Sequence, residues 1–277
     1  MTTGIAAREQ VHRLTVAGYD FACRVRTASR PSPSTPIVLL GGALMDMHDW
    51  GQVEARLPAD ATVLTFDLPG FGSASRLDDV TATGYEIQAE AVLVALDHLG
   101  IGRVDLLGYC YGAGLACLLA DRHADRVARV ALSNVCEELP PETLELLTLA
   151  VDLVEQGRIA HLCEVICERT LGPRDRRALA EAITPGVQDA LRLPHTAATL
   201  RRGLNAHSAV MRNARRITAP LLVVCGQHDV FTPARAGLDL AAGHGTARAV
   251  VLDTGHTPLL EDPEAFVAHV MGHFTSP

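Results

Sequence analysis

Residues 103–119, RVDLLGYCYGAGLACLL, decide the fold of this chain. Their first part is an apolar run typical of a strand in a parallel sheet, and a stretch rich in small residues follows at once, which is typical of a helix packed on that sheet. Between the two stands Gly108-Tyr109-Cys110-Tyr111-Gly112, with a cysteine between two glycines. Larger side chains at the glycine positions would collide with the neighbouring strand and helix. The pattern therefore predicts a strained strand-to-helix turn that exposes Cys110 as a nucleophile.

The plain alternative for Cys110 is a structural core cysteine, because free cysteine is among the most buried residue types. The strand directly before the turn and the helix directly after it favour the nucleophile, since this is the context that such a turn requires.

Short apolar runs on both sides of this stretch predict further buried strands at residues 37–40, 63–66, 104–107, 127–132, 220–225 and 247–252. Helical patterns separate them at residues 49–57, 84–99, 111–122 and 264–274. Alternating strands and helices with short connections predict an α/β fold with a mostly parallel sheet and right-handed crossovers. Before them, two alternating stretches at residues 11–16 and 21–26 predict an N-terminal hairpin, and residues 28–36 read as a loop.

The alternation stops between residues 137 and 216, where only helical patterns occur, at 141–156, 159–170 and 174–183. A strandless block inside one sheet predicts a helical lid and not a second independent domain. We therefore expect a core formed by residues 1–136 and 217–277, with the lid at 137–216. The apolar face of the lid is expected to pack over the sheet and to cover a substrate pocket.

Composition excludes several classes of function. All 24 basic residues are arginine, so chemistry that needs lysine, such as Schiff bases and Walker-type phosphate binding, is excluded. The formal charge of −8 and the absence of a basic run argue against a nucleic-acid partner. The chain has no stretch of about 20 apolar residues, so no membrane span is predicted. Its N-terminal stretch lacks the apolar segment of a signal peptide. Seven cysteines without a small disulfide framework predict free thiols and a cytoplasmic location.

A nucleophile needs a base, and the base needs a group that orients it. Asp229 follows the predicted strand at 220–225, and His256 follows the one at 247–252. Functional groups in open α/β sheets gather at the carboxyl ends of strands, so Cys110, Asp229 and His256 are expected to meet there. Asp229 has an alternative role as a cap of the following helix, and Asn134 is the next polar neighbour if Asp229 points away.

The nucleophile–acid–base order resembles that of the α/β-hydrolase superfamily over nearly the whole chain. The segments that carry this resemblance are VLLGGALMDMHDW at 38–50, FDLPGFGSAS at 66–75, the acid loop at 226–233 and GHTPLLEDP at 255–263. The resemblance implies an α/β-hydrolase fold and an oxyanion hole formed by the backbone N–H groups of Ala43 and Tyr111. It also implies that Leu44 and Met45, in the same loop as Ala43, contact the substrate.

The chain departs from the usual pattern at two places. Gly41-Gly42 stands where most members have His-Gly, and Cys110 stands where most have serine. In having a cysteine at this turn, the chain resembles dienelactone hydrolases and polyhydroxyalkanoate synthases. The sequences of its other loops are more similar to those of hydroxyacyl acyltransferases of the rhamnolipid-precursor type. The resemblance implies acyl esters or thioesters as substrates.

We therefore expect an enzyme in which His256, oriented by Asp229, takes the Cys110 proton and the thiolate forms an S-acyl intermediate. Water as acceptor gives an esterase or thioesterase, and an alcohol or amine gives an acyltransferase. The substrate is a small acyl compound, free or carried on acyl carrier protein or coenzyme A, and no cofactor is expected. Two alternatives stay open. In the first, the site is reused for binding a carbonyl compound or for its isomerisation or cyclisation. In the second, the chain is a non-catalytic interaction protein. The acyl group, its acceptor and the oligomeric state stay open as well.

Three weaker patterns are given their simpler interpretation. Cys163 with Cys167, and His269 with His273, have the spacing of helical metal ligands, but each pair lacks the further ligands that a structural site requires. We expect no metal and interpret them as ordinary helix faces. Gly70 and Gly72 follow a strand but lack the rest of a dinucleotide-binding motif, so they are interpreted as a turn.

Overall fold

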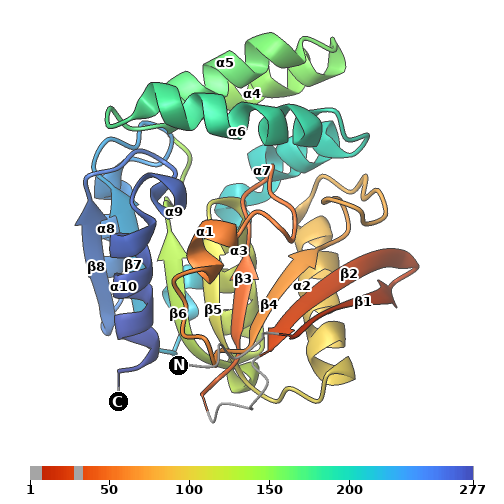
Figure 1. The fold of residues 1–277 in the computed structure, drawn as a ribbon, viewed down its shortest axis with the longest axis vertical. Coiled ribbons are helices and arrows are strands. Elements are labelled where there is room, and N and C mark those ends of the chain that lie inside the picture. The colour runs from red at the N-terminus through yellow and green to blue at the C-terminus, as the bar shows by residue number, and fades with distance from the viewer. Residues whose placement is uncertain (1–7, 28–33, 277) are drawn as a thin grey trace, which may run out of the picture.

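The computed structural model describes residues 8–27 and 34–276, and these form one eight-stranded sheet under a layer of helices (Figure 1). The strand order is β1-β2-β4-β3-β5-β6-β7-β8, and every pairing from β4 to β8 is parallel. The strands are β1 (Arg8–Val16), β2 (Tyr19–Thr27), β3 (Ile37–Leu40), β4 (Val63–Asp67), β5 (Val104–Tyr109), β6 (Val127–Ser133), β7 (Leu221–Gly226) and β8 (Ala247–Leu252). The predicted α/β class with a mostly parallel sheet is confirmed.

The N-terminal hairpin forms one edge of the sheet. Its turn is the two-residue pair Ala17-Gly18, both with positive φ (48° and 84°), which is the backbone that a tight hairpin requires. Strand β2 then pairs antiparallel with β4 and so joins the hairpin to the parallel part. Residues 1–7, the first part of the N-terminal stretch that is predicted not to be a signal peptide, lie outside the described residues. So do residues 28–33 of the predicted loop.

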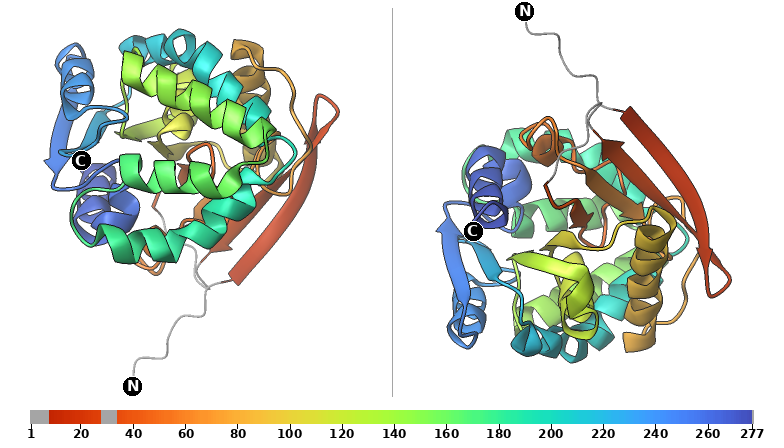
Figure 2. Two further views of the ribbon diagram at one scale, coloured as in Figure 1. Left: turned by 90° about the horizontal axis from the view of Figure 1, so that it is seen from above. Right: turned by 90° about the horizontal axis from the view of Figure 1, so that it is seen from below.

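Helices cover both faces of the sheet (Figure 2). One face carries α2 (Ala82–His98), α3 (Tyr111–Arg122) and α8 (Ala234–Ala242), and the other carries α1 (Gly51–Glu54), α9 (Pro258–Glu261) and α10 (Pro263–Phe274). Side chains of one strand alternate between the two cores, so that Val38 faces the first and Leu39 the second. None of the described helices is long and apolar enough to cross a membrane.

Between β6 and β7 the chain forms four α-helices and no strand in its described part. They are α4 (Pro141–Glu155), α5 (Ile159–Thr170), α6 (Arg176–Leu191) and α7 (Thr196–Met211). We call this segment, residues 137–216, the helical insertion. It lies across the carboxyl ends of the strands (Figure 1) and has its own apolar cluster around Leu153 and Leu162. The division of the chain into core and lid remains a prediction.

Several element boundaries differ from those predicted. Helix α1 is a single turn instead of spanning residues 49–57, because Asp49 accepts a hydrogen bond from the Asp46 N–H (2.7 Å) in a preceding turn and Pro58 follows. Helix α2 begins earlier, at Ala82, since the Thr81 side chain caps it. Helix α6 starts later and continues through Pro185, and α7 was not predicted as a separate helix. Two short 3₁₀ helices, Ala124–Arg126 and Arg212–Arg216, precede β6 and β7.

The close packing of α3 on β3 yields a first prediction. A Cβ atom added at Gly112 would lie 2.1 Å from the Leu40 carbonyl oxygen, which is a backbone atom with no freedom to move aside. Gly112→Ala should therefore lower the free energy of unfolding by about 2–3 kcal/mol, as overpacking does. Urea denaturation measures this. Gly272→Ala, in α10 with no atom within 4 Å of the added Cβ, is the matched control and should not lose stability. Equal stability of the two variants would contradict the packing argument.

Candidate active site

Cys110 sits on a strained turn between β5 and α3. Its φ of 52° and ψ of −114° lie in a region that non-glycine residues rarely occupy. The flanking glycines have no room for a side chain: a Cβ at Gly108 would lie 2.7 Å from the Ala113 Cα, and one at Gly112 would meet Leu40. The Cys110 N–H donates to the Ser133 carbonyl (3.0 Å), which fixes the turn to β6. The predicted strand-to-helix turn is thus present.

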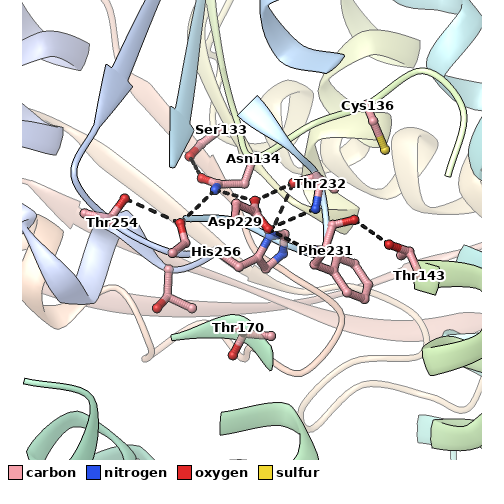
Figure 3. A network of polar contacts seen from close by, with 12 residues as sticks. Ser133, Asn134, Cys136, Thr143, Thr170, Asp229, Phe231, Thr232, Thr254 and His256 are labelled. Atoms are coloured by element: carbon pink, nitrogen blue, oxygen red, sulfur yellow. Dashed lines mark hydrogen bonds and ion pairs between the residues drawn. The ribbon is translucent and has the colours of Figure 1, made fainter. Parts of the chain in front are cut away.

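Asp229 follows β7 and is buried beside His256 (Figure 3). One carboxylate oxygen accepts from the backbone N–H groups of Phe231 (2.8 Å) and Thr232 (2.9 Å). The other accepts from the Thr232 hydroxyl (2.6 Å) and from Asn134 Nδ2 (2.8 Å). Asp229 therefore points inward and does not cap the following helix, and the alternative of Asn134 as its replacement does not apply.

His256 follows β8 and is held from two directions. Its Nδ1 lies 2.8 Å from an Asp229 carboxylate oxygen, as predicted for an oriented base, and its backbone N–H donates to the Thr170 carbonyl (2.6 Å) at the end of α5. The other ring nitrogen, Nε2, is buried and forms no well-aligned hydrogen bond with any residue in the described part of the chain. The ring is packed by Phe231, with centroids 4.8 Å apart.

The charges of these groups are coupled. Burial disfavours a charged Asp229, but His256 and the hydrogen bonds from Asn134 and Thr232 outweigh it and lower the pKa of Asp229 to about 2. Burial likewise opposes a charged His256, yet the Asp229 carboxylate and the Cys110 sulfur raise the pKa of His256 to about 10. Cys110 is thus close enough to act on the imidazole, although Nε2 lacks an aligned bond. Such contacts are often loose in sites without substrate.

The loop after β3 lies against the start of α3. The Gly112 N–H donates to the Gly41 carbonyl (3.0 Å), and the Gly42 N–H points to the Met45 sulfur (3.3 Å). Tyr111 opens α3, so its N–H is among those with no acceptor within the helix. Ala43 and Cys110 line the same cavity. This places both predicted oxyanion donors beside the predicted nucleophile, and their role stays a prediction.

A cavity of about 370 Å³ opens above Cys110 and His256. Leu44 and Met45, predicted to contact substrate, form part of its wall. The insertion supplies most of the rest, through the apolar side chains of Leu146, Leu147, Ala150, Ile166, Ala182, Ile183, Val187 and Leu200. A smaller cavity of about 60 Å³ adjoins Cys110 on the α7 side; its wall is mainly apolar and includes Asn134, Thr199 and His207.

Three residues support the site in roles that were not predicted; Asn134 was predicted only as a replacement for Asp229, and Thr232 and Glu261 were not predicted at all. Asn134, with φ 54°, bridges Asp229 and the Gly255 carbonyl (3.3 Å), and Thr232 contacts both Asp229 and His256. Glu261 accepts from the N–H groups of Gly255 (2.8 Å) and Gly172 (2.9 Å), which ties the histidine loop to the insertion. The spacing Asp-x-x-Thr at 229–232 is the one sequence signal that could have indicated such a turn, because the carboxylate of its first residue accepts from the backbone that follows.

The paired cysteines and histidines have other partners. Cys163 donates to the Thr184 carbonyl (3.8 Å), Cys167 contacts the Thr184 hydroxyl (4.0 Å), and His273 Nε2 lies 3.2 Å from the Pro220 carbonyl. Within the described residues no three His, Cys, Asp or Glu side chains are grouped so as to hold a metal ion. Gly70 and Gly72 both have positive φ (88° and 47°) and belong to the turn after β4.

Comparison with known proteins agrees with this geometry. Residues 35–159 match the family model described as the alpha/beta hydrolase fold. The chain is also 30% identical over 254 residues to a pimeloyl-[acyl-carrier protein] methyl ester esterase of Neisseria meningitidis serogroup C, a match that covers 87% of this chain and 93% of the relative. The chain therefore belongs to the alpha/beta hydrolase family, and the predicted superfamily is confirmed.

More distant relatives have other named substrates. A 2-hydroxy-6-oxononadienedioate/2-hydroxy-6-oxononatrienedioate hydrolase of Klebsiella pneumoniae is 25% identical over 244 residues, 83% of each chain. Among solved structures, the enol-lactonase of Burkholderia xenovorans LB400 superposes with a TM-score of 0.82 at 25% identity, covering 96% of this chain and all of that one (100%). These relatives are named as esterases, hydrolases and a lactonase. The narrower resemblance to hydroxyacyl acyltransferases stays a prediction.

The raised pKa of His256 predicts how stability depends on pH. The folded state holds this proton up to a pKa of about 10, whereas an unfolded histidine releases it near its ordinary 6.5. The stabilisation by the Asp229–His256 pair should be complete below about pH 6.5 and should be lost as the pH rises through 10. At the acid end, the contribution of Asp229 is complete above its ordinary pKa of 3.8 and is lost as the pH falls from there through its lowered pKa of about 2.

The measurement is urea unfolding of the wild type and of Asp229→Asn between pH 6 and pH 10. The difference in free energy of unfolding should be largest at pH 6 and should shrink by at least about 1 kcal/mol at pH 10. A difference that stays constant, or grows with pH, would show that His256 is not charged in the folded protein.

Proposed function

We propose that this protein hydrolyses carboxylic esters with apolar acyl groups through an S-acyl intermediate on Cys110. One observation carries the proposal: Cys110 and His256, whose Nδ1 lies 2.8 Å from the buried Asp229 carboxylate, both line an apolar cavity of about 370 Å³. A histidine held by a buried carboxylate serves proton transfer, and the apolar cavity wall above it suits an acyl chain. The match to an esterase over 87% of the chain supports the same class.

The steps follow from the residue types. The Cys110 thiolate attacks the carbonyl carbon of the ester, and the N–H groups of Ala43 and Tyr111 stabilise the resulting oxyanion. The tetrahedral intermediate collapses as the carbon–oxygen bond breaks and the imidazolium of His256 gives its proton to the leaving alcohol. His256, now neutral, takes a proton from water as this water attacks the thioester. The carboxylic acid leaves, and the thiolate–imidazolium pair is restored.

The residues of the cavity wall limit which acyl groups the site can bind. Within the described residues, no arginine lines the cavity, and the chain has no lysine. A substrate with two carboxylates, such as the dioate in the name of the Klebsiella relative, would find no unpaired cation there, because His256 is already paired with Asp229 (2.8 Å). We therefore propose a neutral, apolar acyl group. An acyl chain carried on acyl carrier protein, as named for the Neisseria relative, or on coenzyme A extends this proposal to larger substrates.

Acyl transfer is the second candidate, and the smaller cavity favours it. This cavity of about 60 Å³ also reaches Cys110 and has Asn134, Thr199 and His207 in its wall. A small alcohol or amine bound there could take the acyl group in place of water, because a thioester remains activated towards such acceptors.

Intact-protein mass spectrometry tests the proposed intermediate. Incubation with p-nitrophenyl hexanoate should add one hexanoyl group to the wild type, and Cys110→Ala should form no adduct and lose at least about 10³-fold in hydrolysis. Cys110→Ser should keep measurable hydrolysis only at high pH, where His256 starts to lose its proton and can act as a base, while the oxyanion donors remain. The matched control is Cys136→Ala, which removes a buried thiol of the neighbouring loop and should still be acylated. No adduct in the wild type would favour a binding or isomerising role.

Alkylation tests whether Cys110 is the activated thiol. Of the seven cysteines, Cys110 alone is partly exposed, and burial raises the pKa of Cys23, Cys136 and Cys225 to about 12. Limiting iodoacetamide should therefore label Cys110 first, as mapped by peptide mass spectrometry. In His256→Ala the labelling should slow markedly, since the cation that stabilises the thiolate is gone. Equal labelling of several cysteines, or no change in His256→Ala, would mean that Cys110 is an ordinary thiol.

A further inference from the structure

One carboxylate interrupts the apolar wall of the large cavity. Asp49 lines this cavity together with Cys110 and His256, and it is the one acidic side chain among the described residues of the wall. Its own side chain is exposed, so it stands at the mouth, where solvent and the cavity meet. The end of a bound substrate that reaches this mouth lies near this carboxylate.

The loop holds Asp49 without neutralising it. Its carboxylate accepts the Asp46 N–H (2.7 Å), and its own N–H donates to the Asp46 carbonyl (3.4 Å). Among the described residues no arginine or histidine forms an ion pair with it, whereas the exposed Asp253, for example, pairs with Arg174 (2.6 Å). Partial burial by the loop, together with the carboxylates of Asp46 and Asp67, raises the pKa of Asp49 more than the Asp46 N–H and His48 lower it.

We propose that Asp49 is a specificity-determining residue that selects acyl groups by charge. It repels acyl chains that end in a carboxylate and favours chains that end in a neutral or cationic group. At the mouth the apolar wall displaces part of the solvent between Asp49 and a second charge, so two like charges repel more strongly there than in bulk water. The inference rests on the proposed ester hydrolysis and adds to it the identity of the group that rejects acidic substrates.

Three methyl esters of equal length test the inference: monomethyl suberate with a terminal carboxylate, methyl octanoate, and methyl 8-aminooctanoate with a terminal ammonium. The quantity compared is the ratio of kcat/KM for each charged ester to that for methyl octanoate, at pH 8. In the wild type this ratio should be low for the anionic ester and higher for the cationic one. Asp49→Asn should raise the ratio of the anionic ester about tenfold and lower that of the cationic ester.

Two controls separate charge from shape. Asp49→Asn keeps an oxygen that accepts the Asp46 N–H, and Asp49→Glu keeps the charge and should keep the wild-type order of the three esters. Glu142→Gln removes an exposed acid of α4 that does not line the cavity and should leave both ratios unchanged. Raising NaCl to 0.5 M should reduce the discrimination by Asp49, because salt screens an exposed charge. Ratios that do not respond to Asp49→Asn would overturn the inference.

Failure of the proposed function is distinguishable from failure of this inference. If the wild type does not hydrolyse methyl octanoate, calorimetry on Cys110→Ala still compares binding of methyl octanoate and monomethyl suberate, with and without Asp49→Asn. Tighter binding of the neutral ester that is lost in the double variant supports the selection by charge even without turnover. If Cys110→Ala, with Asp49 intact, binds the two esters equally tightly, the proposed selection by charge is overturned.

Discussion

The arrangement of the site depends on the contact between α3 and β3 at Gly112. With 2.1 Å between the position of a Cβ atom and the Leu40 carbonyl oxygen, only glycine permits this approach. The approach lets the Gly112 N–H reach the Gly41 carbonyl (3.0 Å) and forces Cys110 into its strained backbone conformation. The proposed nucleophile and the proposed oxyanion loop are therefore fixed by one packing contact, without any direct bond between their side chains.

The histidine side of the site has a different support, which comes from the insertion. The His256 N–H donates to the Thr170 carbonyl (2.6 Å), and Glu261 connects Gly255 with Gly172. The residues after α5 are thus part of the frame that holds the proposed base.

Features carried by local sequence were predictable. The two glycines around Cys110, the buried strands, and the positions of Asp229 and His256 at strand ends all follow from short patterns. Features that arise from tertiary contact were not. Asn134 acts because its left-handed backbone turns its amide towards Asp229, and Asp49 matters because the insertion closes a cavity above its loop. Helix α1 is likewise only one turn long, after a turn in which the Asp46 N–H donates to the Asp49 carboxylate. The hydrophobic pattern of the sequence does not indicate this bond.

The same electrostatics bear on the choice of cysteine as nucleophile. Asp229 is buried and fully hydrogen bonded, so it stays ionised, and it keeps His256 protonated through the physiological range. A serine hydroxyl needs a neutral imidazole as its base, whereas a thiol gives up its proton far more readily and pairs as thiolate with an imidazolium. A site whose histidine has a raised pKa therefore suits cysteine better than serine. In the proposed mechanism this cation already holds the proton that the leaving alcohol requires, so that the first acyl-transfer step needs no prior proton movement. What then receives the acyl group is set by the molecules that the two cavities admit to Cys110.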